Sequence, residues 1–538
     1  MLYLHELLDL LALLELPYMQ IITDLHLHSR FSRAVSPQMT IDGIAGWAGK
    51  KGIGLVATGD WTHPMWMREI GEKLEEDGSG LLRLKNSKLE DRKLKVGVEN
   101  RKSKIDNSNP HSTFQPLPQS SMLYHPSSPR FLLSTEISCI YSQGGKTRRV
   151  HVLVWLPTIA SAQKISKELT KRGCNLLSDG RPIIGLSLIH LAELVLTIEP
   201  NALIVPAHIW TPWFSVYGKM GGFESLEEAF GPYAKHIYAV ETGLSSSPDM
   251  NWRIKELDSR AIVSFSDAHS GAKLGREVTV FEVDEREIKK RDEYVITYAD
   301  ISEALKQPSL EDRVLKVGVE NRKSKIDNSN PHSTFQPLPQ SSMLHRLPSI
   351  VYTIEFYPEE GKYHYTGHRE CNIRLAPEEV VAKGTTCSVC GKPLTQGVMQ
   401  RVEDLATSHQ SSAFDFQKNI KWIRSDIVKN RPPFAMLVPL QEIIAEAIGS
   451  PVASKKTQAH YETLIAHFGT EFLVLMDADI DEIKTVSTPQ IADGVKKVRT
   501  GDIVIDPGYD GVFGVVKIWK SKKEKSLVDK SKEQLGMF

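Results

Sequence analysis

Histidine and carboxylate side chains recur where short apolar runs of this sequence end. His26-x-His28 and Asp267-x-His269 each place two such side chains two residues apart. Because side chains alternate across a strand, both members of each pair would point to the same face. Imidazoles and carboxylates together suit Zn²⁺, Mn²⁺, Fe²⁺ or Mg²⁺, and a carboxylate can bridge two ions. The candidate ligands are His26, His28, Asp60, His63, Glu136, His151, His208, Asp267 and His269.

Any one of these histidines, taken alone, is more simply explained as a packed core residue. Nine ligand-type residues near the ends of six of seven apolar runs favour a metal centre instead. Bound divalent ions lower the pKa of a water molecule, clamp a phosphate and offset charge on the leaving oxygen. The sequence therefore predicts a divalent metal centre, with Mg, Mn or Zn, that could support phosphoester hydrolysis.

A second set of ligand-type residues lies further along the chain. Two residues separate His368 from Cys371, and two separate Cys387 from Cys390. Four soft ligands at this spacing are typical of a closed tetrahedral zinc site. His364 is an alternative fourth ligand. We therefore expect one structural zinc in a small zinc-binding domain over residues 348–405.

The candidate ligands of the first set need a scaffold that brings strand ends together. Residues 19–300 contain seven apolar runs that alternate with helix-like stretches, a pattern typical of buried parallel strands. Seven such units predict an α/β barrel, whose catalytic groups lie at the carboxyl ends of the strands. The runs are 20–28, 53–60, 130–138, 149–156, 202–209, 236–243 and 261–269.

Two nearly identical segments interrupt this organisation. Residues 89–123 recur at 310–344, and the only difference is Lys93, which becomes Val314. Structural repeats diverge in sequence and are usually arranged in tandem. These copies are isolated and rich in Asn, Ser, Pro and Lys, which predicts disordered loops. We interpret them as a duplicated insertion, whose first copy falls inside the barrel between two ligands.

The remaining segments are expected to have separate roles. Residues 1–18 form an N-terminal extension that lacks the basic start of a secretory signal. We expect either that translation starts at Met19 or that the extension is a short accessory helix. Residues 431–519 are expected to form a C-terminal DNA-binding region of helices and hairpins. Residues 520–538 form a Lys-rich tail that we expect to be flexible.

Composition limits the function without identifying it. A chain of 538 residues should form two or three domains. Basic and acidic residues number 66 each, so any DNA-binding surface must be local. No apolar run is long enough to cross a membrane. Five cysteines are too few for a disulfide scaffold, which favours a reducing, cytoplasmic setting.

The ligand motifs resemble those of a known superfamily. DLHLHSRFSRA, TGDWTHP, TEIS, PAHIW and SDAHS look like the successive motifs of the polymerase-and-histidinol-phosphatase (PHP) superfamily. The resemblance implies a distorted seven-stranded α/β barrel with up to three metal ions. It implies one ion on His26, His28, Glu136 and Asp267, a second on Glu136, His151 and His208, and a third on His269 and His63 with Asp60 as an optional ligand.

The third metal site is expected to be weaker than the other two or to be built differently. Many members of the superfamily have another histidine shortly after the first motif. This chain has Ser32, Arg33 and Ala34 there.

Motifs outside the barrel narrow the resemblance. GKYHYTGHRECNIRLAPEE, CSVCGKPLTQGVMQRVEDLA, RPPFAMLVPLQEIIAEAIG and GDIVIDPGYDGVFG look like successive blocks of the endonuclease Q family. Membership would imply cleavage of DNA on the 5′ side of a deaminated base (uracil, hypoxanthine or xanthine) or of an abasic site. Two alternatives are a PHP-type small-molecule phosphatase and a non-enzymatic DNA-binding scaffold. The zinc domain argues against the former, and the intact ligand set argues against the latter.

Two further groups of residues are candidates for DNA-related contacts. Aromatic rings after His208 can stack on an extruded base, or else they pack the rim of the barrel. The C-terminal residues resemble a peptide that binds a sliding clamp, or else they are an apolar end without function. The candidates for base contact are Trp210, Trp213, Phe214, Tyr217, Ser245 and Asn251, and those for clamp binding are Gln534, Met537 and Phe538.

Overall fold

The computed structural model describes residues 18–85, 128–284, 296–306, 347–407 and 412–520, with the backbone of 122–123. Several expectations fall outside these residues. They are the extension before Tyr18, the second insert at 310–344, nearly all of the first insert at 89–123, and the tail after Lys520 with its clamp-binding candidates.

The central strands are buried on both sides, as their continuous apolar runs predict. β1 (Tyr18–Asp24) pairs in parallel with β2 (Leu55–Ala57), which pairs in parallel with β6 (Arg130–Gln143). β6 pairs antiparallel with β7 (Lys146–Leu156), and β7 pairs antiparallel with β9 (Leu203–Pro206). Short strands flank these: β3 (Leu74–Glu76), β4 (Leu82–Leu84), β5 (Met122–Leu123) and β8 (Ile183–Ile184).

The β6–β7 pair differs from the expected pattern. Strands separated by helices were expected here, and the structure has a long antiparallel hairpin instead. Gly144 and Gly145 form the turn with φ values of 59° and 72°. Two consecutive positive φ angles suit a tight hairpin turn, and glycine adopts them without a steric penalty. The parallel expectation was therefore wrong at this position.

Two more strands complete the group that carries the candidate ligands. β10 (Ala239–Glu241) and β11 (Ala261–Val263) form a separate parallel pair. The Ile209 N–H donates to the carbonyl of Glu241 (3.0 Å), and the His28 N–H donates to that of Ala268 (3.1 Å). Within the described residues, the ladder hydrogen bonds do not close into a barrel. The mixed α/β class is confirmed, and the barrel is not confirmed by hydrogen bonding.

The sheet continues from β1 into the second half of the chain. β12 (Val278–Asp284) pairs antiparallel with β1 and with β13 (Ser349–Glu355). Beyond β13 come β18 (Phe434–Met436), β17 (Ile420–Ser425) and β16 (Ser412–Gln417), which ends the sheet. One continuous sheet therefore links the N-terminal strands to the C-terminal region.

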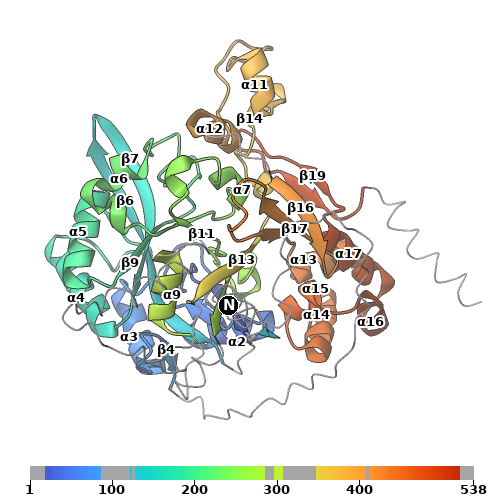
Figure 1. Ribbon diagram of the computed structural model, residues 1–538, viewed down its shortest axis with the longest axis horizontal. Coiled ribbons are helices and arrows are strands. Elements are labelled where there is room, and N and C mark those ends of the chain that lie inside the picture. Colours follow the sequence, from blue (N-terminus) through green and yellow to red (C-terminus); the bar gives the residue numbers. More distant parts are fainter. Residues whose placement is uncertain are drawn as a thin grey trace, which may run out of the picture.

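Helices cover the outer side of the central strands (Figure 1). Thr40, Thr158 and Ser187 begin three of them, and each side chain accepts a hydrogen bond from a backbone N–H of the first turn. The helices are α2 (Ile41–Lys51), α3 (Pro64–Lys73), α4 (Ile159–Lys171), α5 (Leu188–Ile198), α6 (Leu226–Phe230), α7 (Pro248–Asn251) and α9 (Tyr298–Lys306).

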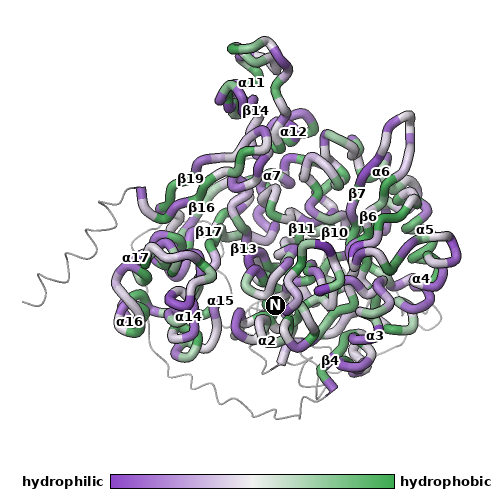
Figure 2. Tube along the Cα trace, turned by 180° about the vertical axis from the view of Figure 1, so that it is seen from behind, coloured by the Kyte–Doolittle hydropathy of each residue, from purple (hydrophilic) through white to green (hydrophobic). Residues whose placement is uncertain are grey.

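The C-terminal region is a group of short helices. Hydrophilic and hydrophobic residues alternate along α14, α16 and α17 (Figure 2), as expected for helices with one buried face. The group comprises α13 (Leu440–Ile448), α14 (Lys455–Phe468), α15 (Glu471–Met476), α16 (Ile480–Val486) and α17 (Pro489–Thr500). In the part of the chain that the structure describes, no helix is long and apolar enough to cross a membrane.

A small arm projects from the rest of the molecule in both views (Figures 1 and 2). It contains β14 (Thr366–His368), β15 (Ile373–Leu375) and α11 (Pro377–Lys383), and α12 (Val398–Leu405) follows it. The hairpin of β19 (Val504–Asp506) and β20 (Val515–Lys517) lies beside its base.

Candidate metal centre

Seven of the nine candidate ligands from the barrel form three overlapping groups. The ligand atoms within each group lie within 4.8 Å of one another. Glu136 belongs to two groups, and His28 also belongs to two, so the three groups form one continuous cluster. The groups are His26, His28 and Glu136; His28, Asp267 and His269; and Glu136, His151 and His208.

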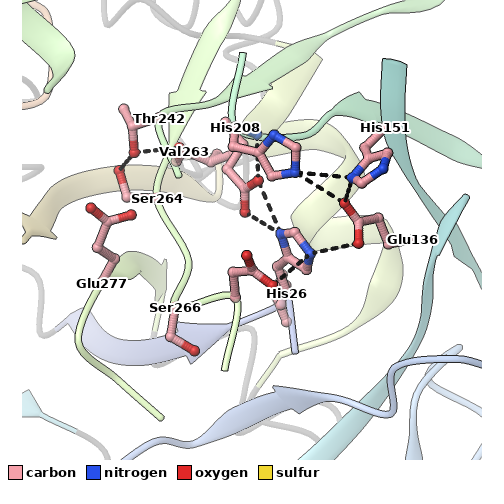
Figure 3. Close-up of polar contacts among 12 residues, drawn as sticks. His26, Glu136, His151, His208, Thr242, Val263, Ser264, Ser266 and Glu277 are labelled. Carbon is pink, nitrogen blue, oxygen red and sulfur yellow. Dashed lines mark hydrogen bonds and ion pairs between the residues drawn. The ribbon is translucent and has the colours of Figure 1, made fainter. Parts of the chain in front are cut away.

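Glu136, in the middle of β6, is the centre of this cluster (Figure 3). Its Oε1 lies 2.5 Å from His151 Nδ1 and 3.0 Å from His208 Nε2. Its Oε2 lies 3.1 Å from His28 Nε2 and 3.8 Å from His26 Nε2. A carboxylate with one oxygen directed to each group of imidazoles is suited to bridge two ions.

The backbone around the ligands is held in uncommon conformations. Asp60, His208 and Asp267 have φ values of 50°, 31° and 45°, which residues other than glycine rarely adopt. A Cβ at Gly243 would lie 2.5 Å from the Cβ of His208, so only glycine permits this approach. Strained backbone of this kind concentrates at functional sites, where surrounding structure holds it in place.

Hydrogen bonds on the far side of the rings fix how the imidazoles face the cluster. His26 Nδ1 lies 2.8 Å from Glu241 Oε1, and His28 Nδ1 lies 3.1 Å from Asp60 Oδ1. His269 Nδ1 lies 2.9 Å from the carbonyl oxygen of Asp267. An N–H at each Nδ1 leaves the lone pair of Nε2 available for a metal ion, the usual arrangement of a metal-binding histidine.

The inward-facing atoms are the ones that a metal would satisfy. His26 Nε2, His28 Nε2 and Asp267 Oδ1 are buried, and among the described residues none makes a hydrogen bond of suitable geometry; their polar neighbours are other ligand atoms, such as the pair His28 Nε2 and Asp267 Oδ1 at 3.2 Å. Buried polar atoms are nearly always paired, so this concentration at one point fits a set of ligands. The donor set of imidazoles and carboxylates therefore fits divalent metal ions.

The pKa shifts of two of the ligands, His151 and Glu136, are consistent with the same role, whereas the surrounding carboxylates raise the pKa of His26 and His28, where a bound cation would take the place of the protons. Burial lowers the pKa of His151 to about 4, so its ring is neutral near pH 7 and keeps a lone pair. Burial alone would raise the pKa of Glu136, but the contacts with His151 and His208 hold it well below its usual value. Metal ligands must be deprotonated, and these two groups are.

Asp60 and His63 do not join a ligand group in the described structure. Asp60 Oδ2 accepts hydrogen bonds from the backbone N–H and hydroxyl of Ser29 (both 2.6 Å), and its Oδ1 orients His28. His63 Nε2 lies 3.3 Å from the carbonyl oxygen of Leu177. The expected pairing of His269 with these residues is replaced by a group of His269, Asp267 and His28.

Two residues of the site were not expected from the sequence. Glu241 is fully buried, and its carboxylate holds both the ring of His26 and the backbone N–H of His208 (2.8 Å). Arg181 Nη1 lies 3.1 Å from Glu136 Oε2. Glu241 ends the sixth apolar run, so its position was a usable signal; Arg181 lies in a loop and offered none.

The metal cluster opens into a cavity of about 310 Å³. His151, His208, Arg181 and Asp267 form one side of it. The segment 358–364 forms another, and it contributes Lys362, Tyr363 and the buried His364. The cavity thus lies between the metal cluster and the base of the projecting arm.

The candidates for base contact divide into two sets. Trp213, Phe214 and Ser245 line the cavity, and the Trp213 ring packs edge-on against Tyr363 (5.0 Å between centroids). Trp210, Tyr217 and Asn251 are buried away from solvent, and the Trp210 indole N–H donates to the Asn251 side chain (2.8 Å). The placement of this second set matches the alternative of rim packing, because a buried, hydrogen-bonded side chain is unavailable to a base.

The second ligand set converges in the arm, at the end of β14. His368, Cys371, Cys387 and Cys390 bring their ligand atoms within 4.8 Å of one another, and His368 Nδ1 lies 3.7 Å from Cys390 Sγ. The backbone N–H of Cys390 lowers the pKa of the Cys387 thiol to about 7, which favours the thiolate that binds metal. His364 lies in the cavity wall instead. These four residues fit one structural zinc.

Comparisons with known proteins agree with this architecture. Residues 439–502 match the model of a family described as the MJ0043 C-terminal domain. An uncharacterised protein of Methanocaldococcus jannaschii, MJ0043, is 29% identical over 59% of this chain, and the match spans 32% of that relative. An uncharacterised protein of Bacillus subtilis, YqxK, is 28% identical over 68% of this chain and 74% of that relative.

Two solved structures resemble the whole architecture. A lesion-specific endonuclease of Pyrococcus furiosus, PfuEndoQ, is 26% identical, with a TM-score of 0.65 over 94% of this chain and 98% of that one. An endonuclease Q bound to duplex DNA with an abasic lesion at its active site is 27% identical, with a TM-score of 0.64 over 94% and 99%. The predicted resemblance is confirmed: this chain has the fold of the endonuclease Q family.

Proposed function

We propose that this protein is a metal-dependent DNA repair endonuclease that hydrolyses the phosphodiester on the 5′ side of a deaminated base or an abasic site. The observation that carries the proposal is the buried cluster centred on Glu136, which opens into a cavity large enough for part of a nucleotide. Its support from relatives is the likeness to a lesion-specific endonuclease.

The proposal includes the shape of the catalytic domain and the boundaries of the others. β1, β2, β6, β7, β9, β10 and β11 would constitute a distorted seven-stranded PHP barrel within residues 19–300. The zinc-binding domain over 348–405 and the helical region over 431–519 would hold the duplex. The cavity between the cluster and the arm supports the role given to the zinc-binding domain, because residues 361–364 and Val398 line it.

The roles of the metal ligands follow from their grouping. His26, His28 and Glu136 would hold one ion, Glu136, His151 and His208 a second, and His28, Asp267 and His269 a third. Such ions supply a water of lowered pKa and stabilise charge on the phosphate. Glu241 and Asp60 orient the imidazoles of His26 and His28, as outer partners of metal-binding histidines do.

The chain's own groups also place the substrate. Arg181 lines the cavity beside Glu136, where its guanidinium can contact a phosphate oxygen. Trp213 and Phe214 present rings to the same cavity, where an unstacked base can lie against them. These side chains would align the phosphodiester and exclude bulk water from it.

The test uses duplexes that contain one uracil, one hypoxanthine, one abasic site or no lesion, incubated with Mg²⁺ or Mn²⁺. We expect a nick on the 5′ side of each lesion by the wild-type protein. Removing a metal ligand weakens the charge stabilisation that the ions supply, so His151→Ala and Glu136→Gln, the latter at the bridging carboxylate, should lower the rate by about 100-fold or more. His467→Ala, which changes an exposed histidine on α14, serves as the control.

Two results would contradict the proposal. Equal nicking of undamaged DNA would remove the lesion from the proposed substrate. Rapid hydrolysis of a simple phosphomonoester without DNA cleavage would favour a small-molecule phosphatase, and DNA binding without any hydrolysis would favour a scaffold.

A further inference from the structure

The turn between β19 and β20 carries an exposed aromatic side chain near the cavity. Phe513 is 66% exposed, and Val512 and Val515 are 40% and 41% exposed. Exposed apolar side chains that cluster on a folded surface mark sites of contact with another molecule.

This turn is fixed to the segment that forms one wall of the cavity. The Gly511 N–H donates to the carbonyl of Lys362 (2.9 Å), and the Gly514 N–H donates to that of Glu360 (3.1 Å). A Cβ at Gly514 would overlap the carbonyl oxygen of Glu359, so only glycine permits this approach. Phe513 is therefore presented on a rigid support, with little conformational freedom to lose on binding.

Lys362 joins the exposed ring to the cavity. Lys362 lines the cavity, and its Nζ lies 4.3 Å from the centroid of the Phe513 ring. A cation and an exposed ring side by side match the two parts of a nucleotide, because the cation attracts a phosphate and the ring stacks on a base. Continuity with the cavity and this charge both favour DNA as the occupant.

We propose that Phe513 acts as a wedge that enters the base stack of duplex DNA beside the lesion, with Lys362 on the adjacent phosphate. The inference rests on the proposed endonuclease function. Extruding a nucleotide from a duplex costs base stacking, and an inserted apolar ring replaces part of that stacking. DNA in which the lesion is already unpaired carries a smaller cost. The wedge should therefore matter for paired duplexes and matter little for unpaired lesions.

The experiment compares single-turnover nicking of two substrates with saturating Mn²⁺. One is a fully paired duplex with a single lesion, and the other places the same lesion in a short unpaired bubble. Phe513→Ala should slow nicking of the paired duplex by about 5- to 100-fold, the range expected for one stacking contact. It should change the nicking rate of the bubble substrate by less than about twofold. Phe513→Tyr should restore the nicking rate of the paired duplex.

Phe414→Ala provides the matched control, since Phe414 is 60% exposed on β16, at the edge of the sheet. An equal loss on both substrates, or no loss on the paired duplex, would overturn the wedge. A wild-type protein that nicks neither substrate would instead refute the endonuclease function, so the two failures are distinguishable.

Discussion

At the scale of single residues, the candidate centre depends on two carboxylates that belong to none of the three ligand groups. Each of them orients a ligand histidine. Glu241 and Asp60 each accept a hydrogen bond at the Nδ1 of a ligand histidine. Asp60 also accepts from the hydroxyl of Ser32 (2.8 Å). Ser32 stands where many relatives were expected to have a metal-binding histidine, and in this chain it supports the outer carboxylate instead.

Replacing Glu241 should weaken metal binding. In Glu241→Gln the amide can no longer hold the His26 tautomer and the His208 backbone together, and the apparent affinity for Mn²⁺ should fall by about 10- to 100-fold. The measurement is the Mn²⁺ dependence of nicking, and saturating Mn²⁺ should restore most of the rate. Glu256→Gln, which alters the carboxylate beside Tyr217, is the control. Unchanged Mn²⁺ dependence would show that Glu241 has only a packing role.

Sequence reasoning located most of this site because ligands leave a local pattern. His26 and His28 lie two residues apart after the first strand, and Glu136 interrupts an apolar run. Both patterns were visible in the sequence. The sequence did not show that Asp60 and His63 lie outside the ligand groups. Their positions depend on the conformation of the loop after β2, which has no local sequence pattern. Arg181 reaches Glu136 from a loop that has no periodic pattern.

At the scale of elements, the projecting arm has only a small apolar core of its own. The apolar core of the arm consists of Leu375, Val380, Cys387 and Leu394 with two partly buried neighbours. So small a core contributes little free energy, and a bound metal is the usual replacement for it. The spacing of the ligands predicted this element, whereas the hairpin of β6 and β7 was missed because the runs 130–138 and 149–156 were expected to be parallel strands separated by a helix.

Loss of one zinc ligand should unfold the arm alone. Cys387→Ser removes a buried thiolate, so the zinc content of the purified protein should fall from one per chain toward zero. Hydrogen exchange should then accelerate across β14, β15 and α11 and remain slow in β1 and β6. Cys174→Ser changes a thiol outside the cluster and should alter neither quantity. Retention of zinc by Cys387→Ser would contradict the assigned ligand set.

At the scale of the whole molecule, the two halves of the chain share one sheet and one apolar core. Ile22 of β1 and Tyr461 of α14 belong to the same cluster of buried side chains. Lys51 and Glu471 form a buried ion pair at 2.7 Å between α2 and α15. Composition indicated several domains, but it could not predict this joint, by which we mean the sheet and core that the two halves of the chain share. The order of strands around β12 and β13 depends on long-range pairing, which has no local signature.

Glu355, at the end of β13, makes this joint sensitive to pH. Its carboxylate contacts Ser264 Oγ (2.5 Å), directly after β11, and Thr242 Oγ1 (3.1 Å), directly after β10. Burial raises its pKa to about 7, and burial together with Glu355 raises the pKa of the neighbouring Glu277 well above its usual value. The folded protein therefore holds a proton on Glu355 that the unfolded chain releases near pH 4.5.

A folded state that binds the extra proton loses stability as that proton is removed. Between pH 4.5 and about 7 the free energy of unfolding attributable to Glu355 should therefore decrease with rising pH. Glu355→Gln keeps a neutral side chain of similar shape at every pH, so it should lose this dependence. Urea unfolding of both proteins at pH 5.5 and pH 8 measures the effect as a difference, in which titrating groups that do not interact with Glu355 cancel and the repulsion from Glu277 is included. The free energy of unfolding of the wild-type protein, relative to that of the variant, should be lower at pH 8 than at pH 5.5. The opposite trend would show that Glu355 is ionised in the folded protein.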